Sequence, residues 1–570
     1  MKARQIRQSF LDFFKEKAHQ IVASSSLIPA DPTVLFTSAG MQQFVPYLSG
    51  EVEPPYRRAA SCQKCFRTSD IDRVGDESHH TFFEMLGNWS FGDYFKEEAI
   101  EMALELLMIN YHLPLDRLWV TVFKGERNIP KDEESIKFWQ KNGISRDRIK
   151  EFGTEDNFWG PVGFSGPCGP CSEIHYDRGE KFRTSECDIK GCGPNCHCGR
   201  FVEIWNLVFM EYNKTKDGKF EKLPAKNVDT GAGLERLACV LQKTKSNFET
   251  DLFLPIIQKI ESLSKTSYSQ QPKAYRIIAD HIRGICFLIA DGVLPSKEDR
   301  GYVLRRIIRR AMRYSKFLEL GKQFLIPIAQ VVIDQYKDIY PELQSRQTDI
   351  LTVIQNEEER FSKTLGEGLK RFEKIVSRID MNLPPVSRII PSQEVFHLYD
   401  TYGFPFELTK ELAEERGLGV SKEDFEKEFS KHQEISRAGV KKKFGGVGEW
   451  GEKVAPHHTA THLLHSALRQ VLGKHVHQAG SDLTPERLRF DFTHPKKLSN
   501  EEIKKVEEIV NQKIKENLLV KMEEMPYEEA IKSGALAFFK EKYSPEVFVY
   551  SIGDFSREVC AGPHVKRTLE

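Results

Sequence analysis

The stretch RRAASCQKCFRTSDIDRVGDESHHTFFEMLGNWSFGDYF, from Arg57 to Phe95, carries the strongest structural signal in the sequence. Its two halves are predicted to be strands, joined by a polar loop from Thr68 to Ser78 that is rich in Asp, Gly and Ser. Arg67 stands where the first strand ends, and aromatic residues follow the loop. An arginine can bind phosphate through two hydrogen bonds and a ring can stack on a base, so the hairpin suits a nucleotide. The alternative is an ordinary half-buried hairpin with a solvated arginine.

The composition describes a multidomain globular protein without net charge. At 570 residues the chain exceeds the size of one hydrophobic core, so about three or four domains are expected. Lys plus Arg equals Asp plus Glu at 83 each, so any nucleic-acid binding must come from local basic patches. No apolar run reaches membrane-spanning length, and no membrane association is expected. The chain is expected to be cytoplasmic, where eleven clustered cysteines favour metal binding over disulfides.

A second segment, DTGAGLERLACVL from Asp229, is predicted to begin a helix near Gly233. Its glycines allow a ligand to approach the backbone closely, and a helix N-terminus attracts anions. Arg236, in the first turn of this helix, could reach a terminal phosphate. The pattern is weak by itself, but with Arg67 it supplies two arginines for two phosphates and one carboxylate, Asp229, for a cation.

Several further runs, taken together, resemble one enzyme family. They are SSSLIPADPTVLFTSAGM, HHTFFEMLGNWSFGDYF, GPCGPCSEIHYD, EIWNLVFM, DTGAGLERL, ADGVLPS, GYVLRRIIRRA, LYDTYGFP, HTATHLLH and RLRFDF, in the family's order. The chain is similar to the alanyl-tRNA synthetases, a family of class II aminoacyl-tRNA synthetases. The resemblance implies an α/β multidomain protein with a class II antiparallel sheet flanked by helices, a helical tRNA-recognition domain and an α+β zinc-containing editing domain. The expected boundaries are 1–250 for the catalytic domain, 251–443 for the helical domain, 444–454 for a linker and 455–570 for the editing domain.

The implied activity is ATP-dependent attachment of L-alanine to tRNA(Ala), with Mg²⁺ as a cofactor. Alanyl-adenylate forms by in-line attack of a carboxylate on the α-phosphorus, so cations must stabilise phosphate charge. By resemblance, Arg67 contacts the α-phosphate, Arg236 the γ-phosphate and Asp229 the substrate ammonium. The implied ATP contacts are Arg67, His80, Phe82, Phe83, Glu84, Gly233 and Arg236, and the implied alanine pocket is Trp159, Asn206, Val208 and Asp229.

The chain departs from the family pattern at two positions of this domain. Ser78 stands where the family usually has arginine, which removes a phosphate or tRNA contact, and Ala232 stands where methionine is usual. Two alternatives remain beside the ligase: an aminoacyl-tRNA deacylase whose synthetase half is degenerate, and a tRNA-binding regulator. The presence of Arg67, Asp229 and Arg236 argues against both.

The loop CDIKGCGPNCHC is one of two candidate zinc sites. Its thiols match a structural zinc knuckle in kind, although the spacing is not that of two CxxC pairs. His197 could replace one thiol, and Cys168 with Cys171 could contribute from upstream. A cysteine-rich loop without metal is the alternative. The separate CxxC of Cys62 and Cys65 lies in a predicted strand and is expected to be packing. The thiols of the loop are Cys187, Cys192, Cys196 and Cys198.

The helical region is expected to recognise tRNA. The run RGYVLRRIIRRAMRYSK, Arg300–Lys316, places several arginines on one helix; such a run is usually a solvated face, but in a tRNA-binding protein it is predicted to contact phosphates. The family reads a G·U wobble pair with an aspartate, here Asp400, and an asparagine, here replaced by Lys297. Because lysine cannot both donate and accept, either the readout relies more on Asp400 and phosphates or the wobble rule is relaxed. The predicted tRNA contacts are Lys297, Arg305, Arg306, Arg309, Arg310 and Asp400.

The C-terminal region carries the other candidate zinc site. His458 and His462 are four residues apart and therefore share one helical face, and CAGPH adds Cys560 and His564. In order, and with RLRFDF between them, these halves resemble the family's editing domain, which hydrolyses seryl- or glycyl-tRNA(Ala). Editing is needed because a small alanine pocket rejects glycine and serine weakly. Gln478 matches a family editing residue, and the usual CGGTH is CAGPH here.

Two family segments are expected to be missing. A β-barrel subdomain normally precedes the HxxxH helix, where this chain has a short linker, and the family continues beyond CxxxH into a domain used for dimerisation. We therefore expect a shortened form, either minimal or truncated, with impaired editing and a monomeric state.

Overall fold

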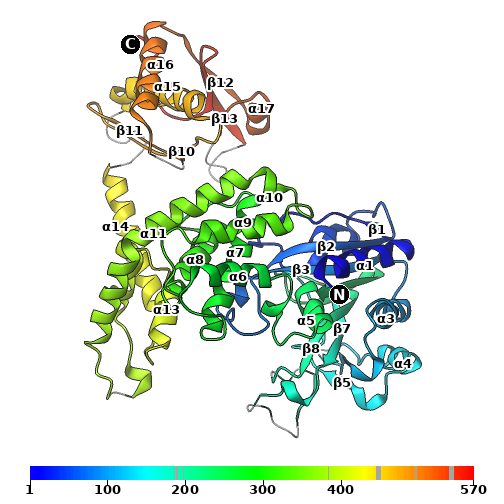
Figure 1. The fold of residues 1–570 in the computed structure, drawn as a ribbon. Coiled ribbons are helices and arrows are strands. Elements are labelled where there is room, and N and C mark those ends of the chain that lie inside the picture. The colour runs from blue at the N-terminus through cyan, green and yellow to red at the C-terminus, as the bar shows by residue number, and fades with distance from the viewer. Residues whose placement is uncertain are drawn as a thin grey trace. The chain divides into compact units, whose positions relative to one another are not determined.

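The computed structural model describes residues 1–126, 128–184, 187, 191–194, 196, 198–382, 384–443, 451–494, 497–537 and 545–570. These residues form two compact units (Figure 1): Met1–Lys374 with Leu398–Leu408, and Ile375–His397 with Thr409–Glu570. Most of the predicted linker at 444–454 lies outside the described residues. The predicted boundaries at 250 and 443 fall inside these units and remain predictions.

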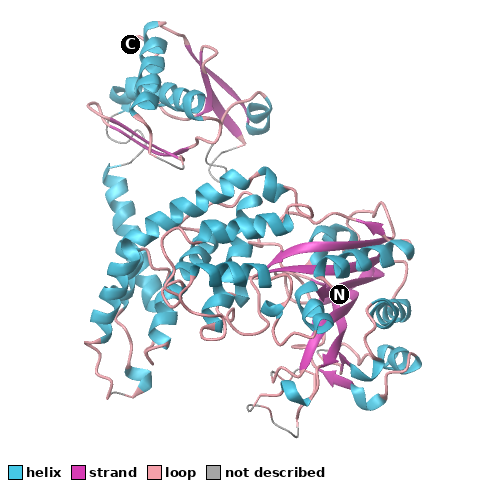
Figure 2. Cartoon of the chain, in the orientation of Figure 1, coloured by secondary structure: helices cyan, strands magenta, loops and turns pink. Residues whose placement is uncertain are grey.

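The first unit is built around a mostly antiparallel sheet (Figure 2). Its described strands are β1 (Gln20–Ile21), β2 (Arg58–Phe66), β3 (Phe82–Phe91), β4 (Leu118–Phe123), β5 (Ile149–Phe152), β6 (Phe158–Trp159), β7 (Gly166–Asp177), β8 (Phe201–Lys214) and β9 (Phe220–Gly233). They lie in the order β1-β2-β3-β9-β8-β7-β4-β5, with β6 beside β7. The predicted hairpin is confirmed, because β2 and β3 pair antiparallel with Phe66 opposite Phe82.

Strand β7 differs from the sequence prediction. The Gly and Pro content of GPCGPCSEIHYD predicts an irregular segment, but this run pairs antiparallel with β8 from end to end. Its register shifts between Cys168 and Cys171, and Pro170 lies opposite Phe158 of β6. The prediction was wrong because a β-bulge lets a strand hold proline without losing its overall pairing.

Helices account for most of the remaining described chain. The helix predicted to begin near Gly233 does so, at Leu234. The helices are α1 (Ala3–Glu16), α2 (Val45–Leu48), α3 (Lys96–Glu105), α4 (Glu133–Lys141), α5 (Leu234–Gln242), α6 (Leu254–Leu263), α7 (Pro272–Ala290), α8 (Asp299–Tyr314), α9 (Leu325–Tyr336), α10 (Glu342–Ser345), α11 (Gln347–Val376), α12 (Ser392–Tyr402), α13 (Phe406–Glu414), α14 (Lys422–Lys443), α15 (Ala455–Leu472), α16 (Asn500–Lys515) and α17 (Tyr527–Lys532).

Helices α1 and α7 cover one face of the large sheet. Phe10 and Phe14 of α1 contact Trp205 of β8, with ring centroids 5.6 and 6.3 Å apart. Phe287 of α7 stacks on Phe82 of β3 at 4.0 Å. Because side chains alternate between the two faces along a strand, the neighbouring residues of β3 and β8 face the other side of the sheet. That side carries the candidate active site.

The second unit combines helices with two small sheets, which confirms the predicted α+β composition. Ala467 and Leu468 of α15 pack against Val506 of α16 in a small apolar cluster. Helix α16 begins at a capping box, in which the Ser499 backbone N–H donates to Glu502 Oε2 at 2.8 Å and the Glu502 N–H donates to Ser499 Oγ at 3.2 Å. The strands are β10 (Gln478–Leu483), β11 (Leu488–Phe492), β12 (Val520–Pro526), β13 (Glu546–Ile552) and β14 (Ser556–Val559).

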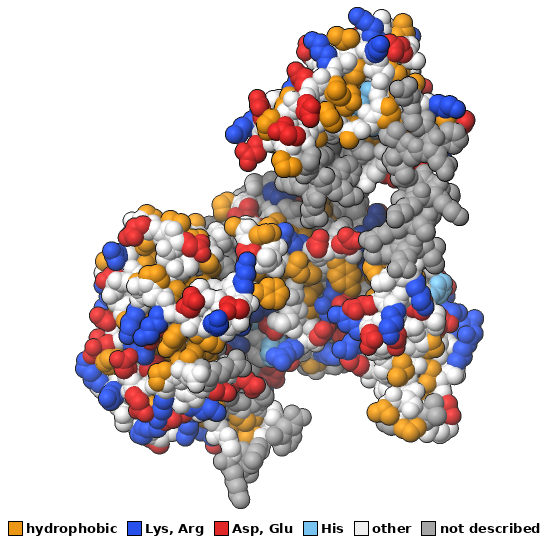
Figure 3. Space-filling view, turned by 180° about the vertical axis from the view of Figure 1, so that it is seen from behind, with side chains coloured by type: hydrophobic (Ala, Val, Ile, Leu, Met, Phe, Trp, Pro, Cys, Tyr) orange, Lys and Arg blue, Asp and Glu red, His pale blue; other side chains and the backbone are white. Residues whose placement is uncertain are grey.

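The surface agrees with the balanced charge of the sequence. On the face of the molecule shown in Figure 3, acidic and basic side chains are interspersed, as expected for a chain with equal numbers of each. Within the part of the chain that the structure describes, no helix is long and apolar enough to cross a membrane.

Candidate active site and metal centres

The centre of the candidate active site is a buried carboxylate on β9. Asp229 lies opposite Trp89 of β3, and the indole Nε1 of Trp89 donates to Asp229 Oδ1 at 2.6 Å. Only 5% of the Asp229 surface is exposed. Burial raises the pKa of Asp229 to about 7, and the hydrogen bond from Trp89 opposes that rise. A cationic ligand group would stabilise the ionised form of this carboxylate.

The predicted alanine pocket assembles around Asp229. In the paired strands Val208 lies opposite Asp229 and Asn206 lies opposite Gly231, so both side chains share its face of the sheet. Val208 and Trp159 pack in the same apolar cluster as Trp89. The buried Oδ1 of Asn206 has no hydrogen-bond partner among the described residues. These side chains therefore bring together one carboxylate, apolar groups and one amide oxygen that has no hydrogen-bond partner among the described residues; their binding of alanine stays a prediction.

Arg67 directly follows β2, and its side chain contacts Phe83, which shares a face of β3 with Trp89. Its Nε donates to the carbonyl oxygen of Ser38 at 3.2 Å, and its guanidinium carbon lies 4.8 Å from the centroid of the Phe83 ring. Both side chains are half-buried. The hydrogen bond and the ring hold the guanidinium in place while part of it stays accessible, as an anion-binding arginine requires.

Arg236 is in the first turn of α5 and is held by an acidic neighbour. Its Nη1 donates to Glu203 Oε2 at 2.6 Å, and 34% of its side chain is exposed.

A second carboxylate lies near Glu203. On β7, His175 Nε2 lies 3.1 Å from Glu173 Oε2, and burial raises the pKa of the Glu173 carboxyl. Glu173 and Glu203 therefore place two carboxylates near Arg236, and carboxylates are ligands that Mg²⁺ takes in nucleotide sites.

Trp89, Glu173 and Glu203 were missed by the sequence reasoning. Trp89 shares its strand face with Phe83 because their spacing is even, and this alternation was a usable signal. Glu203 and Asn206 are an odd number of residues apart, so strict alternation would place them on opposite faces of β8. A shift in the β7–β8 register between Ile174 and His175 moves Glu203 to the face of Asn206, beside Arg236. Alternation alone would have placed Glu203 on the wrong face.

Three side chains predicted to contact ATP lie in the protein core instead. Phe82 is fully buried and stacks on Phe287. Glu84 is also fully buried and forms an ion pair with Arg7 at 2.6 Å. His80 is buried and stacks on a phenylalanine of the helical region. Phe82 and Glu84 are even-numbered residues of β3 and face the covering helices, whereas Phe83 faces the candidate site; the ATP contacts of His80, Phe82 and Glu84 stay predictions.

The arginines of the predicted phosphate-contacting stripe on α8 pair with neighbouring elements, and their contact with tRNA stays a prediction. Arg309 Nη2 donates to Glu357 Oε1 of α11 at 2.5 Å, and Arg306 Nη2 donates to Asp72 Oδ1 at 2.5 Å. Arg310 Nη1 lies 3.1 Å from the ring Nε2 of His281. Long arginine side chains on a packed helix pair with acidic and carbonyl groups of neighbouring elements rather than with solvent. The four predicted arginines are half-buried or buried: Arg305, Arg306, Arg309 and Arg310.

The other two predicted tRNA contacts are accessible. Lys297 lies in the connection between α7 and α8, and Asp400 lies on α12; both are exposed. They therefore remain available to a large ligand.

The predicted C-terminal metal ligands come together in the second unit. His458 and His462 of α15 meet Cys560 and His564, and their ligand atoms all lie within 4.8 Å of one another. The buried Nε2 of His564 has no hydrogen-bond partner among the described residues. Gly562 is required by this arrangement, because an added Cβ would lie 1.8 Å from the ring of His458.

Each histidine of this centre is fixed through the ring nitrogen that would not bind metal. Anchoring of this kind sets the tautomer and directs Nε2 towards the metal. Burial opposes ionisation of Cys560, but the three neighbouring histidines lower its pKa to about 3. Three imidazoles and one thiolate fit Zn²⁺. The Nδ1 partners are the Pro563 carbonyl oxygen for His458 at 3.1 Å, Glu558 Oε2 for His462 at 2.9 Å and Thr459 Oγ1 for His564 at 3.1 Å.

The thiols of the cysteine-rich loop also gather, whereas the other cysteines do not join them. Sγ atoms of all four loop cysteines lie within 4.8 Å of one another. His197 lies outside the described residues. Cys168 and Cys171 are buried in β7 and are not part of the cluster. Cys62 and Cys65 are buried in β2, which confirms that they are packing residues.

Comparisons with known proteins identify the family of this chain. A family model described as tRNA synthetases class II (A) matches residues 5–476. The chain therefore belongs to the class II tRNA synthetases. Within that class it belongs with the proteins named alanine–tRNA ligase: the one from Treponema denticola is 51% identical over 99% of this chain and 94% of its own length.

Other relatives show how this chain differs in length. The alanine–tRNA ligase of Borreliella afzelii is 49% identical over 99% of this chain and 95% of its own length. That of Dehalococcoides mccartyi is 42% identical over 99% of this chain and 77% of its own length, in an alignment of 685 positions. Because that alignment is longer than this chain, the Dehalococcoides protein carries segments that this chain lacks. Among solved structures, apo histidyl-tRNA synthetase of S. aureus aligns with 42% of this chain and 65% of its own length at 13% identity, with a TM-score of 0.27.

Proposed function

We infer that this chain is an alanine–tRNA ligase, which attaches L-alanine to tRNA(Ala) at the expense of ATP. The observation that carries this conclusion is the pocket around Asp229. It combines a buried carboxylate for an ammonium with a small apolar wall, Val208, and an accessible arginine, Arg67, nearby. A deacylase with a degenerate synthetase half is not favoured, because Asp229, Arg67 and Arg236 are all held in place by neighbours.

In the proposed reaction, Asp229 binds the alanine ammonium while the alanine carboxylate attacks the α-phosphorus of ATP. The bond to pyrophosphate breaks in line, and the negative charge that develops needs cations around it. Arg67 stabilises the α-phosphate and Arg236 the γ-phosphate, and the ring of Phe83 stacks on the adenine. Mg²⁺, when bound, neutralises charge on the pyrophosphate. The ribose hydroxyl at the tRNA 3′ end then attacks the adenylate carbonyl and AMP leaves.

Alanine-dependent exchange of pyrophosphate into ATP tests this function. We expect exchange by the parent chain and its loss on Asp229→Asn, which keeps the shape but removes the charge that binds the ammonium. Asp217→Asn, in an exposed turn where Asp217 pairs with Lys219, is the matched control and should leave exchange unchanged. Absence of exchange by the parent, with hydrolysis of seryl-tRNA intact, would establish the deacylase instead.

For tRNA we propose that Asp400 and Lys297 face the acceptor stem. Their exposure supports this proposal. Charging of tRNA(Ala) and of a transcript with the G·U pair changed to G·C should be compared for the parent and Lys297→Asn. We expect the parent to discriminate less than the variant, because the amide restores a donor and an acceptor. Equal discrimination by both chains would exclude a role for position 297.

We further propose that the second unit hydrolyses mischarged tRNA at a zinc site. The gathering of His458, His462, Cys560 and His564 supports this, as does Gln478 at the start of β10. Deacylation of seryl-tRNA(Ala) should be lost on Cys560→Ser while exchange persists. Bound zinc, measured by elemental analysis, should fall in the same variant. If zinc falls but deacylation stays, the metal is structural and the editing proposal fails.

The remaining proposals concern the domain boundaries, the oligomeric state and the cellular compartment. We propose a catalytic domain over 1–250, a helical tRNA-recognition domain over 251–443 and an editing domain over 455–570. A monomer is proposed, which light scattering from the purified chain would check. A reducing compartment such as the cytoplasm is supported by the eleven cysteines, all of which are free thiols.

A further inference from the structure

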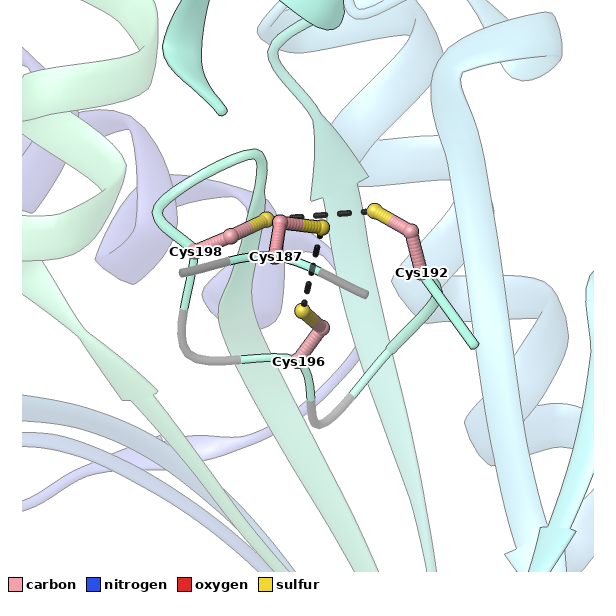
Figure 4. Close-up of side chains that lie close together, drawn as sticks. All are labelled: Cys187, Cys192, Cys196 and Cys198. Carbon is pink, nitrogen blue, oxygen red and sulfur yellow. Dashed lines mark hydrogen bonds between the residues drawn. The ribbon is translucent and has the colours of Figure 1, made fainter. Parts of the chain in front are cut away.

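We propose that the connection between β7 and β8 binds a structural Zn²⁺ through four thiolates, independently of the metal centre in the second unit. Figure 4 shows the four side chains directed towards a common point from separate parts of one loop. The ligands are Cys187, Cys192, Cys196 and Cys198.

Two of the sulfur–sulfur distances match those of tetrahedral coordination. Sγ atoms of Cys187 and Cys196 are 3.7 Å apart, and those of Cys192 and Cys198 are 3.8 Å apart. Zinc–sulfur bonds of about 2.3 Å place neighbouring sulfurs of a tetrahedron about 3.8 Å apart. A disulfide requires about 2.05 Å, so these contacts are not disulfides. The cluster has the spacing that a metal ion would impose.

The four thiolate ligands determine which metal the site prefers and which role the metal has. Four soft thiolates in a tetrahedron favour zinc or iron over magnesium or calcium. Because all four positions are filled by protein, none is left for a substrate, and the site is structural. The guanidinium Nε of Arg183 donates to Cys187 Sγ at 3.3 Å, and an N–H donor of this kind stabilises a ligating thiolate.

Hydrogen bonds at the base of the loop link it to the strand and the helix that carry Glu203 and Arg236. Arg200 binds both carboxylate oxygens of Asp177 at 2.7 and 2.6 Å, which joins the end of β7 to the start of β8. Arg178 Nη2 donates to the carbonyl oxygen of Thr244 at 2.7 Å, just beyond α5. Strand β8 and helix α5 carry Glu203 and Arg236. Zinc coordination closes this loop. It therefore restricts the start of β8, which carries Glu203, and the end of α5, the helix that carries Arg236, the arginine proposed to contact the γ-phosphate.

Zinc stoichiometry of the purified 570-residue chain, measured by elemental analysis, tests the proposal. We expect two zinc ions per chain in the parent and one in Cys192→Ser/Cys196→Ser. Cys560→Ser should also hold one, and combining the three substitutions should leave none. Cys168→Ser, a buried cysteine outside the cluster, is the matched control and should retain two. A Cys192→Ser/Cys196→Ser chain with as much zinc as the parent would overturn the proposal, as would iron in place of zinc.

A second measurement on the unmutated chain covers the case in which the double variant fails to fold. In the zinc-loaded parent, Cys192 and Cys196 should resist alkylation by N-ethylmaleimide until a chelator removes the metal, as read by peptide mass spectrometry. Alkylation at the same rate with and without chelator would show that no metal protects these thiols, and the site would be rejected. Neither result depends on ligase activity, so failure here leaves the proposed function intact.

Discussion

Trp89 and Asp229 lie opposite each other on neighbouring strands, and the Trp89 indole N–H donates to Asp229 Oδ1 at 2.6 Å. The pair places a neutral donor on a carboxylate whose pKa burial has raised to about 7. The carboxylate is thus poised between its two protonation states near neutral pH, and an incoming ammonium favours the ionised one. Substrate binding and deprotonation of Asp229 should therefore be coupled.

Trp89→Phe should weaken alanine binding and leave ATP binding unchanged. Loss of the indole donor removes a hydrogen bond to a charged group, worth about 1.5–3 kcal/mol, so we expect the KM for alanine to rise at least about tenfold. Exchange kinetics with each substrate varied in turn measure this. Trp139→Phe is the control, since Trp139 is also buried and its Nε1 donates to Ser172 Oγ at 2.8 Å, a partner that is not charged. Equal effects of both substitutions on the KM for alanine would count against the role of Trp89.

The pH dependence of alanine binding should report Asp229. Its pKa is raised from 3.8 to about 7, so the protonated fraction grows as pH falls below about 7, and the protonated carboxyl binds the ammonium poorly. We expect the KM for alanine to rise about tenfold per unit of pH below that point. The KM for ATP serves as the internal control. A flat profile for alanine between about pH 5.5 and 7 would refute the raised pKa of Asp229.

Phe83 and Phe82 should respond differently to substitution by leucine. Phe83 is half-buried beside Arg67, and loss of a stacking ring costs about 1–3 kcal/mol, so the KM for ATP should rise about fivefold or more. Phe82 packs in the core against Phe287, so its substitution should lower the midpoint of thermal unfolding instead. The reverse pattern would restore Phe82 as the nucleotide contact.

Arg7→Met should destabilise the first unit strongly. It leaves the buried carboxylate of Glu84 without the guanidinium that lies 2.6 Å away, and breaking a buried ion pair costs about 3–5 kcal/mol. Lys17→Met removes one partner of an exposed ion pair, Lys17–Glu105 at 2.7 Å, and should cost at most about 1 kcal/mol. Denaturant unfolding of both variants measures the difference. Similar small losses for both would show that Glu84 is not dependent on Arg7.

Glu558→Gln should weaken zinc binding in the second unit without abolishing it. Glu558 accepts from the Nδ1 of His462 at 2.9 Å, and loss of such a partner typically costs about 10–100-fold in metal affinity. Competition with a chromophoric chelator would measure this. Glu501→Gln, exposed in the first turn of α16, is the control and should bind zinc as the parent does. No change for Glu558→Gln would mean that His462 is oriented by other contacts.

Local patterns predicted the elements that carry the chemistry. Alternating strands around a polar loop predicted the β2–β3 hairpin, and the glycines before Leu234 predicted the start of α5. His458 and His462 were placed on one face by helical spacing alone, and the structure brings both to Cys560. These features depend on residues that are close in sequence, where backbone geometry and residue type are sufficient.

Tertiary structure decided which side chains are available to a ligand. Residues 82 and 83 are adjacent aromatic residues, and only the helices packed on β3 determine which one is buried. The arginines of α8 form a basic run in sequence, but Glu357 and Asp72 pair with two of them from distant parts of the chain. The sequence by itself thus determined the family, the hairpin and the metal-ligand sets. The partners of Asp229, Arg236 and the α8 arginines required the fold, because burial and pairing depend on contacts between residues far apart in the chain.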